Sequence, residues 1–489
     1  MKKTVRLTAI LLALLLLCSC TEQTTPGGND SPDSSQSTTE TTADDYETRD
    51  LGNREFIFLN CPRDQWSMHC AIAPEEINGE PVNDLMFERN RYVEDILNCT
   101  ITETNLGNIY DITEALRKSV IAGDDEYQIV YIPMSDGMTS ISEKLIHELG
   151  KFDELQFDKP WWNQALLDSG SVGGKIYFAA SSLHLMSIDG IWCMFFNQNM
   201  MDDLGLEYPY ELVRQGKWTF DKMMQYCKAA SNLNGDEKFS PFSFEGNSVY
   251  GCVSIVNGVS KYLYGAGLNY AVKDKENMLV SNLNSSSFIG VLDKYATFFG
   301  DSGIFMNVQA SQDFSAYTGG ITPYIAAFTQ NRSLLIGTEV KVANTLRVMD
   351  QPFGVLPFPK LDENQSDYRS TALNQLSVAT IPVTADRPED CALLLDLLSC
   401  ESDKQVLDTF IANTIEQKGL RNDESIEMLK LIRDNLSFDP GIAFQIAPDL
   451  EVSLRSKLLA GDSSFASEIA SAESAVKEKL AALTEKITE

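Results

Sequence analysis

Short continuous apolar runs alternate with helical patterns along most of this 489-residue chain, and this alternation constrains the fold more than any other feature. Most of the runs are apolar throughout, as expected of strands that helices cover on both faces. Helical spacing of apolar residues predicts helices at 84–97, from 386–388 to 398, and at 469–487. Strands that interleave with helices predict an α/β architecture with mainly parallel sheets. The predicted strands lie at residues 55–60, 127–132, 175–180, 191–197, 333–337, 353–358 and 375–382.

The first fifty residues have a different character. Three basic residues precede an apolar stretch at 10–17, which is shorter than the ~20 apolar residues that span a bilayer and is typical of a secretory signal. The stretch ends in Leu17-Cys18-Ser19-Cys20, which resembles a bacterial lipobox with Cys20 as the lipidated residue. We therefore predict a lipoprotein signal peptide at 1–20 and an anchor that holds the chain at the extracytoplasmic face of the cell membrane. The polar, low-complexity segment 21–50 is expected to be a flexible tether.

The remaining part, about 440 residues, is too long for one hydrophobic core and predicts two lobes or domains. The formal charge of −31 excludes nucleic acid as a partner, because an acidic surface repels phosphates. The acidic residues are spread along the chain, which favours a role in solubility over selection for a cationic ligand. We expect a monomer.

Motifs for catalysis or metal binding are missing from the sequence. No zincin, nucleophile-elbow or P-loop motif occurs, so we expect no enzyme and no cofactor. No Cys/His spacing indicates zinc, and we expect no metal. A carboxylate pair of a surface glycoside hydrolase stays open, because 70 acidic residues guarantee chance pairs. Whether Cys61 and Cys70 form a disulfide in an exported protein also stays open.

Several short motifs follow one another along the chain, and their order is informative about the family. They are Lys-Pro-Trp-Trp at 159–162, Gly-Lys-Ile-Tyr at 174–177, Phe-Phe-Asn-Gln-Asn at 195–199, Gly-Lys-Trp-Thr-Phe at 216–220 and Phe-Gly-Val-Leu-Pro-Phe-Pro-Lys at 353–360. Together and behind a lipobox, they resemble the extracellular solute-binding proteins of ABC transporters, family 1, the maltose-binding-protein type.

This resemblance implies a periplasmic-binding-protein-like fold, with two α/β lobes joined by a hinge of several segments and a ligand cleft between them. It implies an N-terminal lobe of residues 51–183 plus 377–418, and a C-terminal lobe of residues 184–376 plus 419–489. The crossovers are expected near 181–185, 373–378 and 417–422. The family captures small polar solutes, most often mono- or oligosaccharides, and delivers them to an ABC permease. A peptide or polyamine ligand stays open.

Sugar recognition combines aromatic faces with fixed polar groups, and α/β sheets place ligands just beyond the carboxyl ends of their strands. This reasoning and the analogy with relatives make Asn257 and Tyr262 weaker candidates. We expect Trp161 and Trp162 to pack within a lobe and not to bind ligand. The candidate ligand-binding residues are Asp64, Gln65, Trp66, Asp136, Asp189, Trp192, Trp218 and Glu339.

Overall fold

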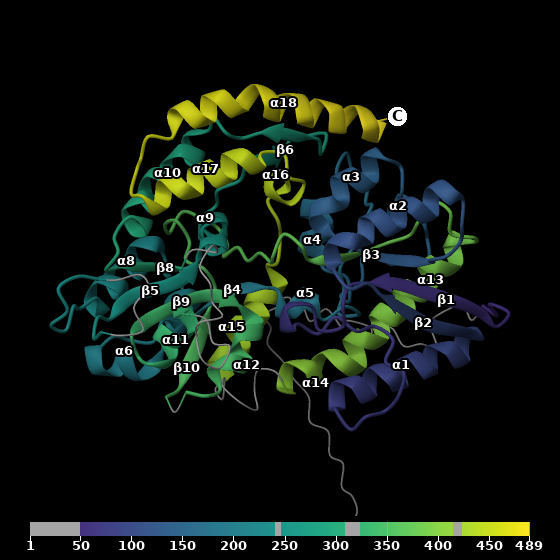
Figure 1. The fold of residues 1–489 in the computed structure, drawn as a ribbon, viewed down its shortest axis with the longest axis horizontal. Helices are drawn as coiled ribbons and strands as arrows, with labels where there is room; N and C mark the ends of the chain where they lie inside the picture. Colours follow the sequence, from purple (N-terminus) through teal and green to yellow (C-terminus); the bar gives the residue numbers. More distant parts are fainter. Residues whose placement is uncertain (1–48, 240–245, 309–322, 350, 414–422, 489) are drawn as a thin grey trace, which may run out of the picture. The chain divides into compact units, whose positions relative to one another are not determined.

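A computed structural model describes residues 49–239, 246–308, 323–349, 351–413 and 423–488 (Figure 1). The predicted signal peptide, Cys20, nearly all of the tether and the whole of the predicted crossover at 417–422 lie outside the described residues. Among the helices of the described part, none is both long enough and apolar enough to cross a membrane.

The first sheet has four strands in the order β11-β3-β1-β2. Strand β1 pairs in parallel with β2 and β3, and β11 runs antiparallel to β3. The strands are β1 (Arg54–Asn60), β2 (Cys99–Asn105), β3 (Ile129–Pro133) and β11 (Ser377–Thr380). Helices around this sheet, on the right in Figure 1, are α1 (Pro81–Leu97), α2 (Ile112–Ala122), α3 (Gly137–Ser142), α4 (Gln164–Gly170), α13 (Pro388–Glu401) and α14 (Leu407–Ile411).

The second sheet has five strands in the order β10-β4-β9-β5-β8. Strand β5 is parallel to β8 and β9, and β4 is antiparallel to β9 and β10. The strands are β4 (Trp192–Asn197), β5 (Tyr250–Ile255), β8 (Phe305–Val308), β9 (Ser333–Glu339) and β10 (Phe353–Leu356). The helices that we group with this sheet are α5 (Met186–Asp189), α6 (Gln198–Leu204), α7 (Tyr210–Arg214), α8 (Phe220–Ala230), α11 (Pro323–Thr329), α12 (Ala343–Leu346) and α15 (Asp423–Asp434).

A third group of elements contains a small antiparallel hairpin and the C-terminal helices. The last helix, α18, contacts α17 and β7 of this group and also α3, which lies beside the first sheet (Figure 1). The group consists of α9 (Val259–Gly265), β6 (Ala271–Lys273), β7 (Leu279–Ser281), α10 (Ser286–Phe299), α16 (Pro440–Ala443), α17 (Pro448–Leu459) and α18 (Ala466–Thr488).

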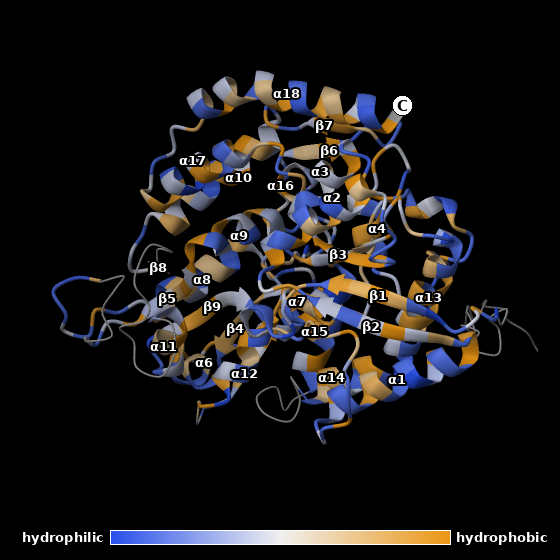
Figure 2. Cartoon of the chain, turned by 45° about the vertical axis from the view of Figure 1, so that its right-hand side comes forward, coloured by the Kyte–Doolittle hydropathy of each residue, from blue (hydrophilic) through white to orange (hydrophobic). Residues whose placement is uncertain are grey.

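Apolar strands form the centre of each sheet, and the helices turn their polar faces outward (Figure 2). Every residue of β3 and β4 is buried, which explains why these strands are apolar runs without alternation. The predicted α/β class is therefore confirmed. Strand β11 completes the first sheet from far along the chain, and the lobe boundaries stay a prediction.

One predicted strand is wrong. Residues 175–180 are extended but form only isolated bridges, at Val172–Lys175 and Ala179–Ala379. Gly173 and Gly174 both have positive φ and turn the chain sharply just before this segment. The segment therefore meets β11 at one residue and does not continue as a paired strand.

Candidate functional site

A cavity of about 390 Å³, here called the cleft cavity, lies where strands of both sheets end. Trp66 and Met68 follow β1, Asn257 follows β5, and Glu339 is the last residue of β9. Ligand sites of α/β proteins lie at such carboxyl ends. The lining of the cleft cavity consists of Trp66, Met68, Tyr110, Trp192, Ile255, Asn257, Ser260, Lys261, Glu339, Lys341, Leu373, Asn374, Gln375, Glu451 and Arg455.

Aromatic side chains form one wall of the cleft cavity. Trp66 is 38% exposed and Tyr110 is 56% exposed, and their ring centroids lie 6.2 Å apart in an edge contact. Trp192 is buried, and its indole N–H has no hydrogen-bond partner among the described residues. Buried polar groups nearly always form a hydrogen bond, so this N–H is available to donate to an acceptor atom of a ligand. Exposed aromatic faces beside fixed donors suit the apolar faces and hydroxyls of a sugar.

The loop that carries Trp66 has an unusual backbone. Trp66 and Ser67 have φ of 52° and 61°, in the left-handed region that residues other than glycine seldom adopt. The carbonyl of Trp66 accepts a hydrogen bond of 2.7 Å from Nζ of Lys341, which follows β9 in the other sheet. Observed strain of this kind is typical of ligand-binding loops, where surrounding contacts hold the chain in place.

Asp189 also contacts this loop. Its Oδ2 atom accepts from the backbone N–H of His69 at 2.9 Å and lies 2.7 Å from Nδ1 of the same residue. Burial alone would lower the pKa of His69, but the hydrogen bond and charge of Asp189 outweigh burial, and the pKa is raised. Asp189 is buried and does not line the cleft cavity. The structure therefore gives it a positioning role behind the loop.

Charged and amide side chains provide the polar part of the lining. Nζ of Lys261 donates to Oδ1 of Asn374 at 2.7 Å. Arg455 and Glu451, one helical turn apart on α17, form an ion pair of 3.6 Å. Oε2 of Glu339 accepts from the hydroxyl of Thr338 at 3.0 Å. The cleft cavity thus offers several donors and acceptors at fixed positions.

The structure gathers three of the eight sequence candidates, Trp66, Trp192 and Glu339, in the cleft cavity, and it also brings in the weaker candidate Asn257. Asp64 and Gln65 precede Trp66 in the same loop but do not line the cavity. Contact of any candidate with ligand stays a prediction.

Two candidates have other surroundings. The carboxylate of Asp136 accepts from the hydroxyl of Thr113 at 2.6 Å and lies outside the lining. Trp218 is fully buried, and its indole N–H donates to the carbonyl of Pro357 at 3.1 Å, so we assign it to the core.

The lining residues that the sequence reasoning missed include Tyr110, Lys261, Lys341 and Arg455. Lys341 had a usable signal, since it comes two residues after the end of β9. Lys261 also had one, because it interrupts the apolar segment of α9. Tyr110 and Arg455 reach the cavity only through tertiary packing.

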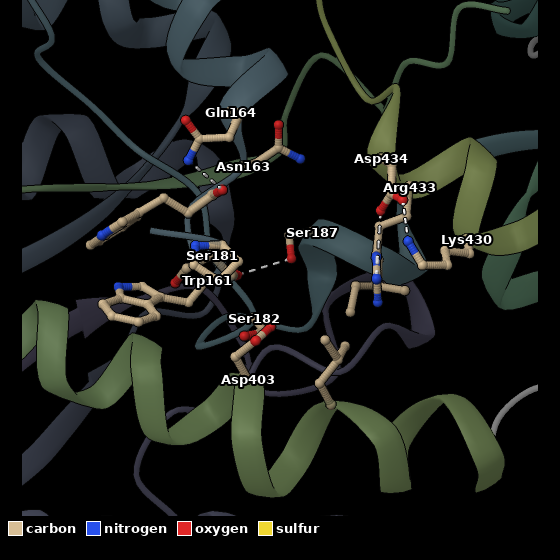
Figure 3. Close-up of a pocket in the computed structure, with 14 residues that line it drawn as sticks. Trp161, Asn163, Gln164, Ser181, Ser182, Ser187, Asp403, Lys430, Arg433 and Asp434 are labelled. Atoms are coloured by element: carbon tan, nitrogen blue, oxygen red, sulfur yellow. Dashed lines mark hydrogen bonds and ion pairs between the residues drawn. The ribbon is translucent and has the colours of Figure 1, made fainter. Parts of the chain in front are cut away.

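A second cavity, of about 420 Å³, lies among helices and not at strand ends (Figure 3). Three of its four charged residues pair with one another, since Asp434 contacts Lys430 at 2.7 Å and Arg433 at 3.6 Å, and the fourth is Asp403. The indoles of Trp161 and Trp162 line it and both donate to Oδ1 of Asp396. Its lining is therefore largely satisfied internally, and we regard the cleft cavity as the candidate site.

The fold also assembles a cluster that the sequence spacing did not reveal. The side chains of Cys61, Cys70 and His184 are buried, and their ligand atoms lie within 4.8 Å of one another, close enough to hold a metal ion. Both cysteines are free thiols in this structure. Contact with Cys70 and His184 lowers the pKa of Cys61 to about 5, and the Cys61 contact together with burial raises the pKa of Cys70.

No family model and no curated protein sequence matches the chain. Among solved structures, the sugar-binding protein MalE from Xanthomonas citri matches with a TM-score of 0.59 and 13% identity, over 87% of this chain and 97% of that one. The cyclic alpha-maltosyl-1,6-maltose binding protein from Arthrobacter globiformis matches with a TM-score of 0.56 and 13% identity, over 87% and 98%. The ABC substrate-binding protein Lmo0181 from Listeria monocytogenes, in complex with cycloalternan, matches with a TM-score of 0.52 and 14% identity, over 89% and 99%.

These similarities confirm the predicted fold. The chain has the two-lobed α/β fold of ABC sugar-binding proteins of the maltose-binding type, and it spans nearly the whole of the matched chains. At such low identity the likeness establishes the fold alone.

Proposed function

We propose that this chain is a lipid-anchored, extracytoplasmic solute-binding protein that captures a mono- or oligosaccharide and delivers it to an ABC permease. One observation carries the carbohydrate assignment. The exposed residues Trp66 and Tyr110 line the same cavity as Trp192, whose buried indole N–H has no hydrogen-bond partner in the described part of the chain. A pyranose offers both an apolar face for stacking and a hydroxyl acceptor for that donor.

The fold supports this proposal. Solved proteins with the same fold bind cycloalternan and maltotetraose, and several are named as sugar-binding proteins. Two lobes that close over a ligand expel water from it and present a changed outer surface, which a permease can recognise.

The other ligand classes and activities have less support. Three cationic side chains in the lining disfavour a polyamine. A glycoside hydrolase needs two carboxyl groups that act on the bond to be cleaved, and of the two that line the cleft cavity Glu451 is engaged by Arg455. We therefore propose binding without turnover.

Thermal unfolding with a panel of saccharides, peptides and polyamines tests the function. A ligand present at a hundredfold excess over its Kd stabilises the folded state by about 2.7 kcal/mol, which raises the melting temperature. We expect a rise with saccharides that are recovered unchanged. A rise with peptides or polyamines only would contradict the carbohydrate assignment, and consumption of the sugar would contradict the absence of catalysis.

Cell fractionation tests the anchor. Replacement of the lipidation residue, Cys20→Ser, should move the protein from the membrane fraction to the soluble exported fraction. A Cys18→Ser variant serves as the matched control, because Cys18 belongs to the predicted signal and not to the mature chain.

A further inference from the structure

The cleft cavity has a charge of opposite sign to that of the chain as a whole. The chain has a formal charge of −31, yet the lining of this cavity contains three cationic side chains and two carboxylates. The cations are Lys261, Lys341 and Arg455, and the carboxylates are Glu339 and Glu451. The net positive charge of this cavity therefore differs from the acidic character of the chain and indicates a role for the cationic side chains in the cavity itself.

The two lysines have neutral hydrogen-bond partners. Nζ of Lys261 donates to the amide oxygen of Asn374, and Nζ of Lys341 donates to the carbonyl of Trp66, each at 2.7 Å. Neither lysine forms an ion pair with a carboxylate anywhere in the described part of the chain, whereas Arg455 has Glu451. With Glu339 as the remaining carboxylate, the lining keeps one uncompensated positive charge.

Lys261 makes this arrangement costly for the empty protein. Its side chain lies on α9 and the residue is only 6% exposed. A buried ammonium group without an anionic partner destabilises the folded state, and an anion beside it removes much of this cost.

We propose, on the basis of the proposed function, that the ligand of the cleft cavity is an acidic sugar with a carboxylate, such as a uronic acid or an oligomer of it. The carboxylate binds between Lys261 and Lys341, and the sugar ring packs against Trp66 and Tyr110. A carboxylate carries one negative charge, which matches the uncompensated charge of the lining. A phosphoryl group carries close to two at neutral pH and exceeds it.

The titration of Lys261 supports the proposal and provides a signature for it. Burial lowers the pKa of Lys261 to about 8, and the positive charge of Arg455 adds to this lowering. The negative charges of Glu451, Glu339 and Asp439 act in the opposite direction but do not outweigh burial. A carboxylate beside the ammonium raises this pKa again. Binding of an acidic sugar above pH 8 must therefore take up a proton, and its affinity falls as the pH rises from 8 to 9.5. A neutral sugar has no such requirement.

Isothermal titration of the complete mature protein with matched sugars tests the proposal. The pairs are galacturonate with galactose and glucuronate with glucose, as monomers and short oligomers, and glucose 6-phosphate serves as the dianionic probe. At pH 7.5 we expect each uronate to bind at least tenfold more tightly than its neutral partner. The preference should decrease between pH 8 and 9.5.

Variants assign the preference to the two lysines. Lys261→Met should abolish the preference for the uronate over its neutral partner, and Lys341→Gln, at a half-buried residue, should reduce this preference. Lys118→Met, whose side chain is 74% exposed on α2, is the matched control and should change nothing. Removal of an unpaired buried charge should not lower the melting temperature of Lys261→Met; if this variant nonetheless misfolds, Lys341→Gln and the pH profile of the unaltered protein decide.

Equal or tighter binding of the neutral sugars overturns the acidic-sugar assignment and leaves the proposed function intact. Tighter binding of the sugar phosphate than of any uronate overturns the carboxylate assignment. If no saccharide binds, neutral or acidic, the proposed function itself fails together with this inference.

Discussion

At the scale of single residues, the five tryptophans of this chain separate into different roles. Trp66 is 38% exposed at the cleft cavity, whereas Trp218 is fully buried in the core of the second sheet. The same residue type therefore contributes to binding in one place and to stability in the other.

Replacement of these two tryptophans by alanine should separate the two roles. We expect Trp66→Ala to weaken ligand binding about tenfold, through the lost stacking surface, and to change the free energy of unfolding by less than about 1 kcal/mol. Trp218→Ala should destabilise the fold by about 3–5 kcal/mol, because it leaves a large cavity. Titration calorimetry and denaturant unfolding measure the two quantities. A large loss of stability in Trp66→Ala would mean that this side chain is structural.

The pair of His69 and Asp189 makes part of the stability depend on pH. The pKa of His69 is raised above its unfolded value of 6.5, so the stabilising contribution is fully present below about pH 6.5. It is lost as the pH rises through the higher pKa of the folded state. We expect Asp189→Asn to flatten the decrease of the melting temperature over this range and to weaken ligand binding, because the Trp66 loop loses its support.

A double-mutant cycle provides the control for this pair. His69→Gln should reproduce the flat profile, and addition of Asp189→Asn to it should cause no further flattening. Independent effects of the two changes on the pH profile would show that the pair is not the source of the pH dependence.

The site could be predicted from the sequence only in part, for reasons that differ between residues. Trp66 and Glu339 are predictable because they lie at or beyond the ends of predicted strands, and strand ends meet in this fold. The role of Asp189 could not be predicted, since its partner His69 lies 120 residues away in sequence. Arg455 reaches the cavity because α17 packs near α9, and such helix packing leaves no local trace in the sequence.

At the scale of elements, the close approach of the segment after β5 to β4 positions Trp192. A β-carbon added at Gly258 would lie 2.4 Å from the hydroxyl oxygen of Ser254 and 2.9 Å from the ring of Trp192. Glycine is needed there for space, because its φ of −70° is accessible to any residue. The segment that follows β5 therefore fixes the position of the Trp192 indole, and Trp192 lines the cleft cavity.

Gly258→Ala should displace Trp192 and weaken ligand binding by a larger factor than it reduces stability. We expect a loss of binding of about tenfold or more and a destabilisation of about 1–3 kcal/mol, typical of overpacking. Gly290→Ala on α10 is the matched control, since nothing lies within 4 Å of the added carbon. That variant should bind normally and gain about 0.5–1 kcal/mol in stability. Unchanged tryptophan fluorescence and binding in Gly258→Ala would contradict the positioning of Trp192 by this glycine.

Some strands with both faces covered could be predicted from the sequence, but β5, with five of its six residues buried, was missed. Strands β3 and β4 are buried throughout and appear as apolar runs. Strand β2 escaped prediction because it is an edge strand rich in threonine, with only two of its seven residues buried. Residues 175–180 have the composition of a strand, but the positive φ of Gly173 and Gly174 and the single bridge to β11 prevent an extended pairing.

At the scale of the whole molecule, the described residues form one large apolar core beside a smaller apolar cluster of α1, α5 and α14. It includes Ile132 of β3 in the first sheet, Phe195 of β4 in the second sheet and Leu480 of α18. Helix α18 contacts α17, β7 and α3, so it adds a connection between the surroundings of the two sheets beyond the crossovers of the chain. A core that continues through both sheets couples their unfolding.

We therefore expect one cooperative thermal transition, with equal calorimetric and van't Hoff enthalpies. Leu480→Ala should lower the midpoint, by a destabilisation of about 2–5 kcal/mol, and keep a single transition, because the buried leucine belongs to the shared core. Glu478→Ala, an exposed change on the same helix, should leave the midpoint nearly unchanged. Two resolved transitions in the unaltered protein, only one of which responds to Leu480→Ala, would show that the sheets unfold independently. Ligand bound at the cleft cavity, between residues that follow β1 and β9, should raise the single transition as a whole.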